Sequence, residues 1–221
     1  MANLFFLVSG ENPSLPSSEV KSILEAEGFA YHVLEELIQV LRIEADPRCA
    51  TPIEHRSAMT RICGTEILNC EANLGTILEN VKRADVSPFI SEGESFAVRV
   101  KRVRESPLEV DGWALEQEIG EVLFKNVGGN RVNLKTPQKT FLGVLTAGRF
   151  VFGLKTAEIK SGEFIKRGPR RRAFFHPSAM PAKLARCMVN LAQPRTGELV
   201  MDPFCGTGSF LVEAGLMGCR V

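Results

Sequence analysis

The chain has few tryptophan, tyrosine and histidine residues. Its 221 residues include one tryptophan, one tyrosine and three histidines. The six cysteines form no C-x-x-C pair and are not spaced with the histidines as metal ligands would be. We therefore expect no metal site, and we interpret the cysteines as reduced, mostly buried thiols of a cytoplasmic protein.

Long hydrophobic runs are also absent from the sequence. The apolar run within Met1–Gly10 is short and lacks a basic start, which is typical of a strand and not of a signal peptide. No segment reaches the length needed to cross a membrane, and we expect no membrane partner. A hydrophobic content of 44% in 221 residues is enough for more than one globular core.

The charge is unevenly distributed along the chain, although the net charge is only +1. Residues 1–93 have a net charge of −7, and residues 94–172 have a net charge of +7. The basic middle third is a candidate nucleic-acid surface. A solvated charged face explains the charge count alone equally well.

Residues 1–52 predict a small β-α-β-β unit. Strands are expected at Asn3–Ser9, Tyr31–Leu37 and Gln39–Ala45. A helix is expected to begin at Ser17 or Ser18 and to end at Gly28. We expect this unit to serve as a scaffold and not in catalysis.

Residues 53–157 predict a second α/β unit. Its helices are expected at Ile53–Leu68, Asn73–Val81 and Asp111–Lys125. Its strands are expected at Ser95–Val103, Val132–Leu134, Thr140–Thr146 and Phe150–Thr156. In the first of these strands Arg99 and Lys101 alternate with apolar residues, so they are expected on the exposed face as RNA contacts. Core packing explains Trp113, near the start of the third helix, at least as well as base stacking.

The segment V-N-L-K-T-P-Q-K-T-F-L-G-V-L, followed by F-V-F-G-L-K-T, resembles the end of a THUMP domain. THUMP domains occur in tRNA-modifying enzymes, where a small ferredoxin-like domain precedes them. The resemblance implies a ferredoxin-like unit at 1–52, a THUMP-like domain at 53–157 and a catalytic domain after them. It also implies binding of the tRNA acceptor end.

Residues 158–173 form an expected linker rich in basic side chains. Five of its basic residues lie close together, Lys166, Arg167, Arg170, Arg171 and Arg172. Such groups can bind RNA phosphates and release condensed counterions. We expect phosphate contact, with a solvated linker as the alternative.

Residues 174–221 contain a strand, a glycine loop and a helix in that order. The apolar run Leu199–Met201 predicts a strand buried on both faces, and Ser209–Met217 predicts a helix. Gly206 and Gly208 lack a β-carbon, so a ligand can lie against the backbone between these elements. Free N–H groups at the helix start favour an anion, and Asp202 at the strand end can meet an ammonium group. A ligand with an amino-acid end would suit both.

The string D-P-F-C-G-T-G-S-F resembles the first cofactor motif of amino-group methyltransferases that use S-adenosylmethionine (SAM). Together with the preceding F-F-H-P-S segment and the helix expected after Ser178 and Pro181, it resembles archaeal tRNA guanosine-10 N2-methyltransferases of the THUMP type. The fold class implied is α/β, ending in the first strand-loop-helix of a Rossmann-like methyltransferase domain. The implied SAM-binding residues are His176, Pro177, Ser178, Asp202, Pro203, Phe204, Cys205, Gly206, Gly208 and Ser209. An alternative that explains His176 equally well is that it stands at the entry to the helix and bonds to the backbone.

The implied reaction moves a methyl group from SAM to the exocyclic amine of a tRNA guanine, at guanosine 10. In this family a Pro-Pro-aromatic motif downstream of the glycine loop aligns the amine, but no two of the 12 prolines here are adjacent. We therefore expect no catalytic residue in this chain, which would be a truncated or split methyltransferase and inactive alone. Two alternatives stay open: a tRNA-binding module that needs a separate C-terminal methyltransferase chain, and an amino-methyltransferase acting on rRNA or DNA.

Overall fold

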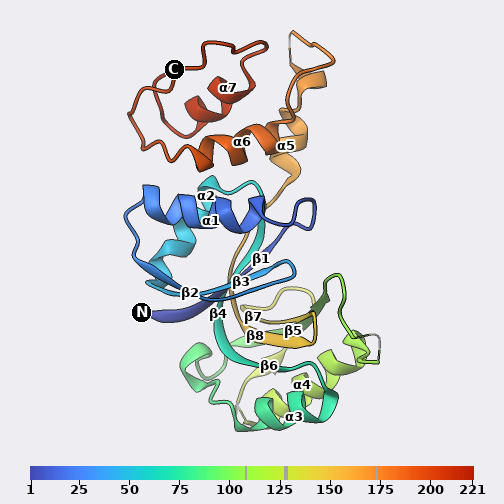
Figure 1. The fold of residues 1–221 in the computed structure, drawn as a ribbon. Coiled ribbons are helices and arrows are strands. Elements are labelled where there is room, and N and C mark those ends of the chain that lie inside the picture. Colours follow the sequence, from blue (N-terminus) through green and yellow to red (C-terminus); the bar gives the residue numbers. More distant parts are fainter. Residues whose placement is uncertain (108, 127–128, 173) are drawn as a thin grey trace.

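The computed structural model describes residues 1–107, 109–126, 129–172 and 174–221 (Figure 1). The strands are β1 (Ala2–Val8), β2 (Tyr31–Leu37), β3 (Val40–Ala45), β4 (Thr60–Glu71), β5 (Ser95–Arg102), β6 (Arg131–Val132), β7 (Lys139–Thr146) and β8 (Arg149–Glu158). The α-helices are α1 (Leu15–Ala26), α2 (Ala50–Arg56), α3 (Leu74–Arg83), α4 (Gly112–Asn126), α5 (Gly162–Lys166), α6 (Ala182–Leu191) and α7 (Ser209–Leu216). Short 3-10 turns are η1 (Pro47–Cys49), η2 (Ser87–Phe89) and η3 (Pro169–Arg171).

One eight-stranded sheet runs through the first two expected units, in the order β2-β3-β1-β4-β8-β7-β5-β6. Neighbouring strands are antiparallel except for β5, which pairs in parallel with β6 and β7. The strand β4 joins the two halves because it pairs with β1 on one side and with β8 on the other. The α/β fold class is confirmed, and the two units share a sheet instead of meeting only at a linker.

The helix expected at Ile53–Leu68 is wrong over most of its length. Only Ala50–Arg56 is helical, and Thr60–Glu71 is the long central strand β4. The segment is rich in β-branched residues, which favour a pleated surface, and its backbone groups are satisfied by strands on both sides. A β-carbon at Gly64 would lie 2.4 Å from the Phe5 ring, so glycine permits close packing of that ring on β4.

Two helical layers cover the two ends of the sheet (Figure 1). Helices α1 and α2 pack on the N-terminal half, over a core that includes Phe6, Ile23 and Ile43. Helices α3 and α4 pack on the other half, where the rings of Phe141 and Phe152 stack with centroids 6.0 Å apart. Burying each such side chain contributes about 1.5–3 kcal/mol.

The exposure of Trp113 excludes the core-packing interpretation. Its side chain is 68% exposed, whereas Leu115, Ile119 and Leu123 form the buried face of α4. Trp113 therefore lies on the surface, where it and the exposed Phe124 line the same hollow.

The C-terminal part stacks on α1 through α6, with α7 on the far side of α6 (Figure 1). The fully buried carboxylate of Glu19 on α1 accepts hydrogen bonds from the backbone of Ala58 (3.0 Å) and Met59 (2.8 Å). It also accepts one from the side chain of Asn190 on α6 (2.8 Å). This network fixes the C-terminal part against the N-terminal unit.

Two details of the C-terminal part differ from expectation. Leu199 and Met201 are 68% and 79% exposed, so this run is not a buried strand. Its pairing is a single parallel bridge from Leu199 to Arg220, which leaves the flanking side chains without neighbours to bury them. Helix α6 begins directly after Pro181, which occupies its N-cap position without a side-chain capping hydrogen bond, and not after Ser178. No helix in the described ranges is both long and apolar enough to cross a membrane.

Candidate functional site

The glycine loop between Asp202 and α7 is open to a ligand. Gly206 and Gly208 have φ values of 52° and 70°, a left-handed region that favours glycine. A β-carbon on Gly208 would have no atom within 4 Å, and one on Gly206 would be 4.0 Å from the Phe204 carbonyl. The loop is therefore shaped by backbone geometry and not by packing, and a ligand can approach its backbone.

The carboxylate of Asp202 is partly free. Its Oδ1 accepts the N–H of Phe204 at 3.0 Å, which tightens the turn into the loop. Its Oδ2 has no hydrogen-bond partner within the described residues. Phe204, 92% exposed, and Cys205, also exposed, lie beside it. Asp202 can thus offer one oxygen to a cationic group of a ligand.

The hydroxyl of Ser209 holds the glycine loop against two other segments. It accepts a hydrogen bond from Nη1 of Arg172 at 3.1 Å and donates one to the carbonyl of Met180 at 3.1 Å. Ser209 is buried, so this hydroxyl serves the protein, while its role toward a cofactor stays a prediction. The glycine loop, the linker and the segment before α6 therefore meet at one residue.

His176 takes part in a local turn before α6. Its Nδ1 accepts the backbone N–H of Ser178 at 3.2 Å and lies 2.6 Å from the Ser178 hydroxyl. This arrangement agrees with the alternative interpretation of His176, that of a residue near the helix start bonded to the backbone. The cofactor roles of His176, Pro177 and Ser178 remain predictions.

A buried ion cluster behind the loop was not predicted from the sequence. Glu213 of α7 is fully buried, with Oε1 2.7 Å from Nε of Arg167 and Oε2 2.8 Å from Nε of Arg186. Burial lowers the pKa of Arg186, and the nearby carboxylate opposes that shift. In the sequence, one charged residue within the apolar run S-F-L-V-E-A-G-L indicates a buried ion pair, but it does not identify the arginines that pair with it.

The structure divides the five basic residues at 166–172 of the linker into two groups. Lys166 pairs with Glu163 at 2.6 Å, Arg167 pairs with Glu213, and Arg172 bonds to Ser209. The guanidinium groups of Arg170 and Arg171 have no hydrogen-bond or ion-pair partner in the part of the chain that the structure describes. Of these five, Arg170 and Arg171 are therefore left free for an anionic ligand.

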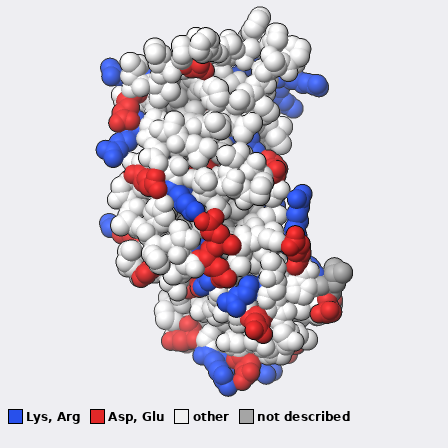
Figure 2. Space-filling view, viewed as in Figure 1, with Lys and Arg blue, Asp and Glu red and all other residues white. Residues whose placement is uncertain are grey.

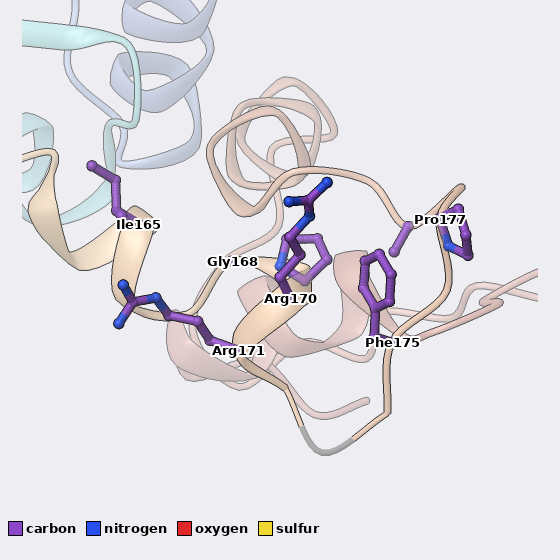
Figure 3. Close-up of a pocket in the computed structure, with 8 residues that line it drawn as sticks. Ile165, Gly168, Arg170, Arg171, Phe175 and Pro177 are labelled. Atoms are coloured by element: carbon purple, nitrogen blue, oxygen red, sulfur yellow. The ribbon is translucent and has the colours of Figure 1, made fainter.

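Arg170 and Arg171 line a pocket of about 450 Å³ (Figure 3). Its other walls include Ile165, Phe175 and Pro177. In Figure 3, Arg170 and Phe175 extend from the two chain segments that flank the pocket, while Arg171 extends toward Ile165. The pocket combines free positive charge with exposed apolar surface.

A second basic hollow lies on the sheet. Arg99 and Lys101 line a cavity of about 380 Å³ together with Lys135 and Lys155, which sequence reasoning missed. The Arg99 guanidinium already donates to the carbonyls of Val98 (2.9 Å) and Leu134 (2.6 Å), so Lys101 is the freer group. Acidic and basic side chains are interspersed on the face shown in Figure 2, so that face has no uniform basic patch.

Two protein-family models match parts of the chain. The THUMP domain family matches residues 71–154, and the RMKL-like methyltransferase domain family matches residues 169–221. The first match lies within the eight-stranded part of the chain, and the second includes the glycine loop and α7. These matches overlap the domains expected at 53–157 and 174–221, whose boundaries remain predictions.

Two curated relatives are similar over almost the whole chain. The tRNA (guanine(10)-N2)-dimethyltransferase of Methanothermobacter thermautotrophicus is 36% identical, over 99% of this chain and 62% of its own length. The protein of the same name from Methanocaldococcus jannaschii is 31% identical, over 98% of this chain and 65% of its own length. The chain thus spans less than two thirds of the length of these relatives.

Solved structures share the fold. TrmN from Thermus thermophilus aligns with a TM-score of 0.60 at 19% identity, covering 98% of this chain and 62% of that one. SMU.472, solved as a complex with SAH, aligns with a TM-score of 0.61 at 14% identity, covering 98% and 55%. At these identities the likeness establishes the fold, and the THUMP and methyltransferase assignment rests on the sequence matches.

Proposed function

We propose that this chain takes part in methyl transfer from SAM to N2 of a tRNA guanine, at guanosine 10. The observation that supports it best is the open glycine loop with a partly free Asp202, in a chain 36% and 31% identical to two tRNA (guanine(10)-N2)-dimethyltransferases. The six free cysteines, five of them buried, agree with a cytoplasmic location.

The residues of the loop fit SAM. The open space over Gly206 and Gly208 admits a ligand against the backbone, and the first N–H groups of α7 suit its carboxylate. The free Oδ2 of Asp202 suits its ammonium group. When bound, SAM supplies an electrophilic methyl group, and the protein's task is to align an acceptor nitrogen with it.

The tRNA would be held by basic groups on both domains. On the THUMP side these are Arg99 and Lys101, and on the linker they are Arg170 and Arg171. Phosphate contacts of this kind position the RNA without reading its sequence. A guanine within a stem must leave its stack before its N2 can reach a methyl donor.

A second candidate function is an RNA-binding chain whose catalytic groups are supplied by another polypeptide. The exposed apolar side chains of Leu199 and Met201, just before the glycine loop in the chain, favour it. Such a surface is typical of a site where further protein packs.

The experiment measures SAH binding by calorimetry and methylation of a tRNA transcript, with a transcript that has adenosine at position 10 as the control. Asp202→Asn should weaken SAH binding about tenfold or more, because hydrogen bonds to charged groups are worth about 1.5–3 kcal/mol. Glu198→Gln, an exposed carboxylate nearby, is the matched control and should bind SAH as wild type does. Absence of SAH binding by the wild-type chain would contradict the proposal. Methylation only after addition of a second chain would favour the second candidate.

A further inference from the structure

The pocket beside the linker has the groups that recognise a nucleotide. Arg170 and Arg171 are exposed and their guanidinium groups are without partners among the described residues, whereas Lys166, Arg167 and Arg172 of the same linker are engaged. Two adjacent unpaired cations attract a polyanion and fit a phosphate group. Charge complementarity therefore points to a phosphate-bearing ligand.

The same pocket presents an aromatic and aliphatic surface. Phe175 is 44% exposed and Ile165 is 67% exposed, and Pro177 adds a further apolar wall. Bases stack on exposed aromatic rings with little dependence on sequence, since every base has a π-face. In Figure 3 the ring of Phe175 lies across the pocket from Arg170, so one ligand with a base and a phosphate could contact both.

Two residues that directly follow pocket-lining residues in the chain connect the pocket to the glycine loop. Arg172, next to Arg171, donates to the hydroxyl of Ser209 at the start of α7. Met180, next to the lining residue Ala179, accepts a hydrogen bond from the same hydroxyl. Both walls of the pocket are thus tied to the first residue of the helix that follows the loop.

We propose that this pocket binds an unstacked nucleotide of the RNA strand that contains the target guanine. The ring of Phe175 stacks on the base, and Arg170 and Arg171 bind the adjoining phosphates. The inference rests on the proposed function, because it requires an RNA substrate next to the methyl donor. It adds a contact that holds the RNA strand with the target guanine beside the glycine loop.

The test measures the affinity of the full chain for a tRNA transcript by fluorescence anisotropy at several salt concentrations. Phe175→Ala should weaken binding about fivefold or more without changing the salt dependence. The double variant Arg170→Ala/Arg171→Ala should lower the slope of log K against log salt by about 1.4 to 1.8, for two lost phosphate contacts. The matched controls are Phe174→Ala, an exposed phenylalanine outside the pocket lining, and Lys166→Ala, a cation already paired with Glu163. Both control variants should show smaller changes in tRNA affinity and in salt slope than the pocket variants.

A second measurement needs no substitution in the protein. A tRNA transcript that contains 4-thiouridine is irradiated with the wild-type chain, and the crosslinked peptides are identified by mass spectrometry. We expect crosslinks in the peptide that contains Phe175. Crosslinks confined to other peptides would overturn the proposal even if the variants fold poorly.

The outcomes separate the two levels of inference. If the wild-type chain binds tRNA and the pocket variants behave as the controls do, the pocket is not a nucleotide site and the proposed function stands. If the wild-type chain binds no tRNA, the proposed function and the nucleotide pocket both fail.

Discussion

Replacing Glu213 should loosen the C-terminal part of the molecule. Its carboxylate is fully buried and forms ion pairs with Arg186, whose side chain is only 6% exposed, and with Arg167, which is 25% exposed. Glu213→Gln keeps the shape and one acceptor oxygen but removes the negative charge. Arg186 then remains buried without a counter-ion.

The magnitude follows from the burial of the partners. Removing one member of a buried ion pair costs about 3–5 kcal/mol. Because Arg167 keeps access to water, the lower end of about 3 kcal/mol is expected. For a chain of 221 residues that corresponds to a fall in Tm of about 6–12 °C.

Thermal unfolding followed by circular dichroism measures this loss. Hydrogen exchange should show earlier opening of α7 than of the central sheet, because only the C-terminal part loses an interaction. Glu163→Gln breaks an exposed pair with Lys166 and should leave the Tm unchanged. The double variant Glu213→Leu/Arg186→Met removes the uncompensated charge and should recover part of the loss. A Glu213→Gln protein within 2 °C of wild type in Tm would refute the reasoning.

Three further predictions concern the loop, a thiol and an ion pair. Gly208→Ala places an L side chain at φ 70°, which costs about 1–2 kcal/mol, and should weaken SAH binding in calorimetry, whereas Gly215→Ala in open space on α7 should not. A thiol reagent at pH 8 should modify Cys205 first, because Cys205 is exposed while burial raises the pKa of Cys49 to about 11 and that of Cys187 to about 12. Bound SAH should slow the modification of Cys205. Mass spectrometry that finds a buried cysteine modified first would contradict this prediction. The hydrogen bond from Lys183 lowers the pKa of the Glu11 carboxyl. The contribution of this pair to stability is therefore complete above the ordinary carboxyl pKa and is lost as the pH falls through the pKa of Glu11 in the folded protein. Glu11→Gln should flatten this acidic part of a plot of Tm against pH.

Sequence reasoning located the elements whose signal is local. The strands at Tyr31–Leu37 and Arg149–Glu158 and the helix α7 appear close to their expected bounds, because alternation, turn glycines and helical spacing are read within a few residues. It failed at β4, where Ile62, Cys63 and Ile67 fit helical spacing as well as a strand. Pairing with β1 and β8 decided the matter, and these partners lie far away in the sequence.

The candidate site shows the same division. The glycine loop could be predicted, because Asp202, Gly206 and Gly208 are close together and their geometry is set by the backbone. The Glu213 cluster could not, because its arginines lie 27 and 46 residues earlier in the chain. A lone acidic residue in an apolar helix indicates a buried partner but does not identify it.

The basic linker shows why the two interpretations of its charge could not be separated in advance. Lys166, Arg167 and Arg172 are identical in kind to Arg170 and Arg171, and nothing in a run of basic residues distinguishes them. Folding distinguishes them by giving Arg167 a buried carboxylate and Arg172 a serine hydroxyl, while the turn η3 directs Arg170 and Arg171 to a pocket. A charge that stabilises the fold is already neutralised or hydrogen-bonded and has little left for a phosphate. The RNA-binding capacity of the linker therefore depends on which cations the fold leaves unused, and a count of its basic residues overstates that capacity.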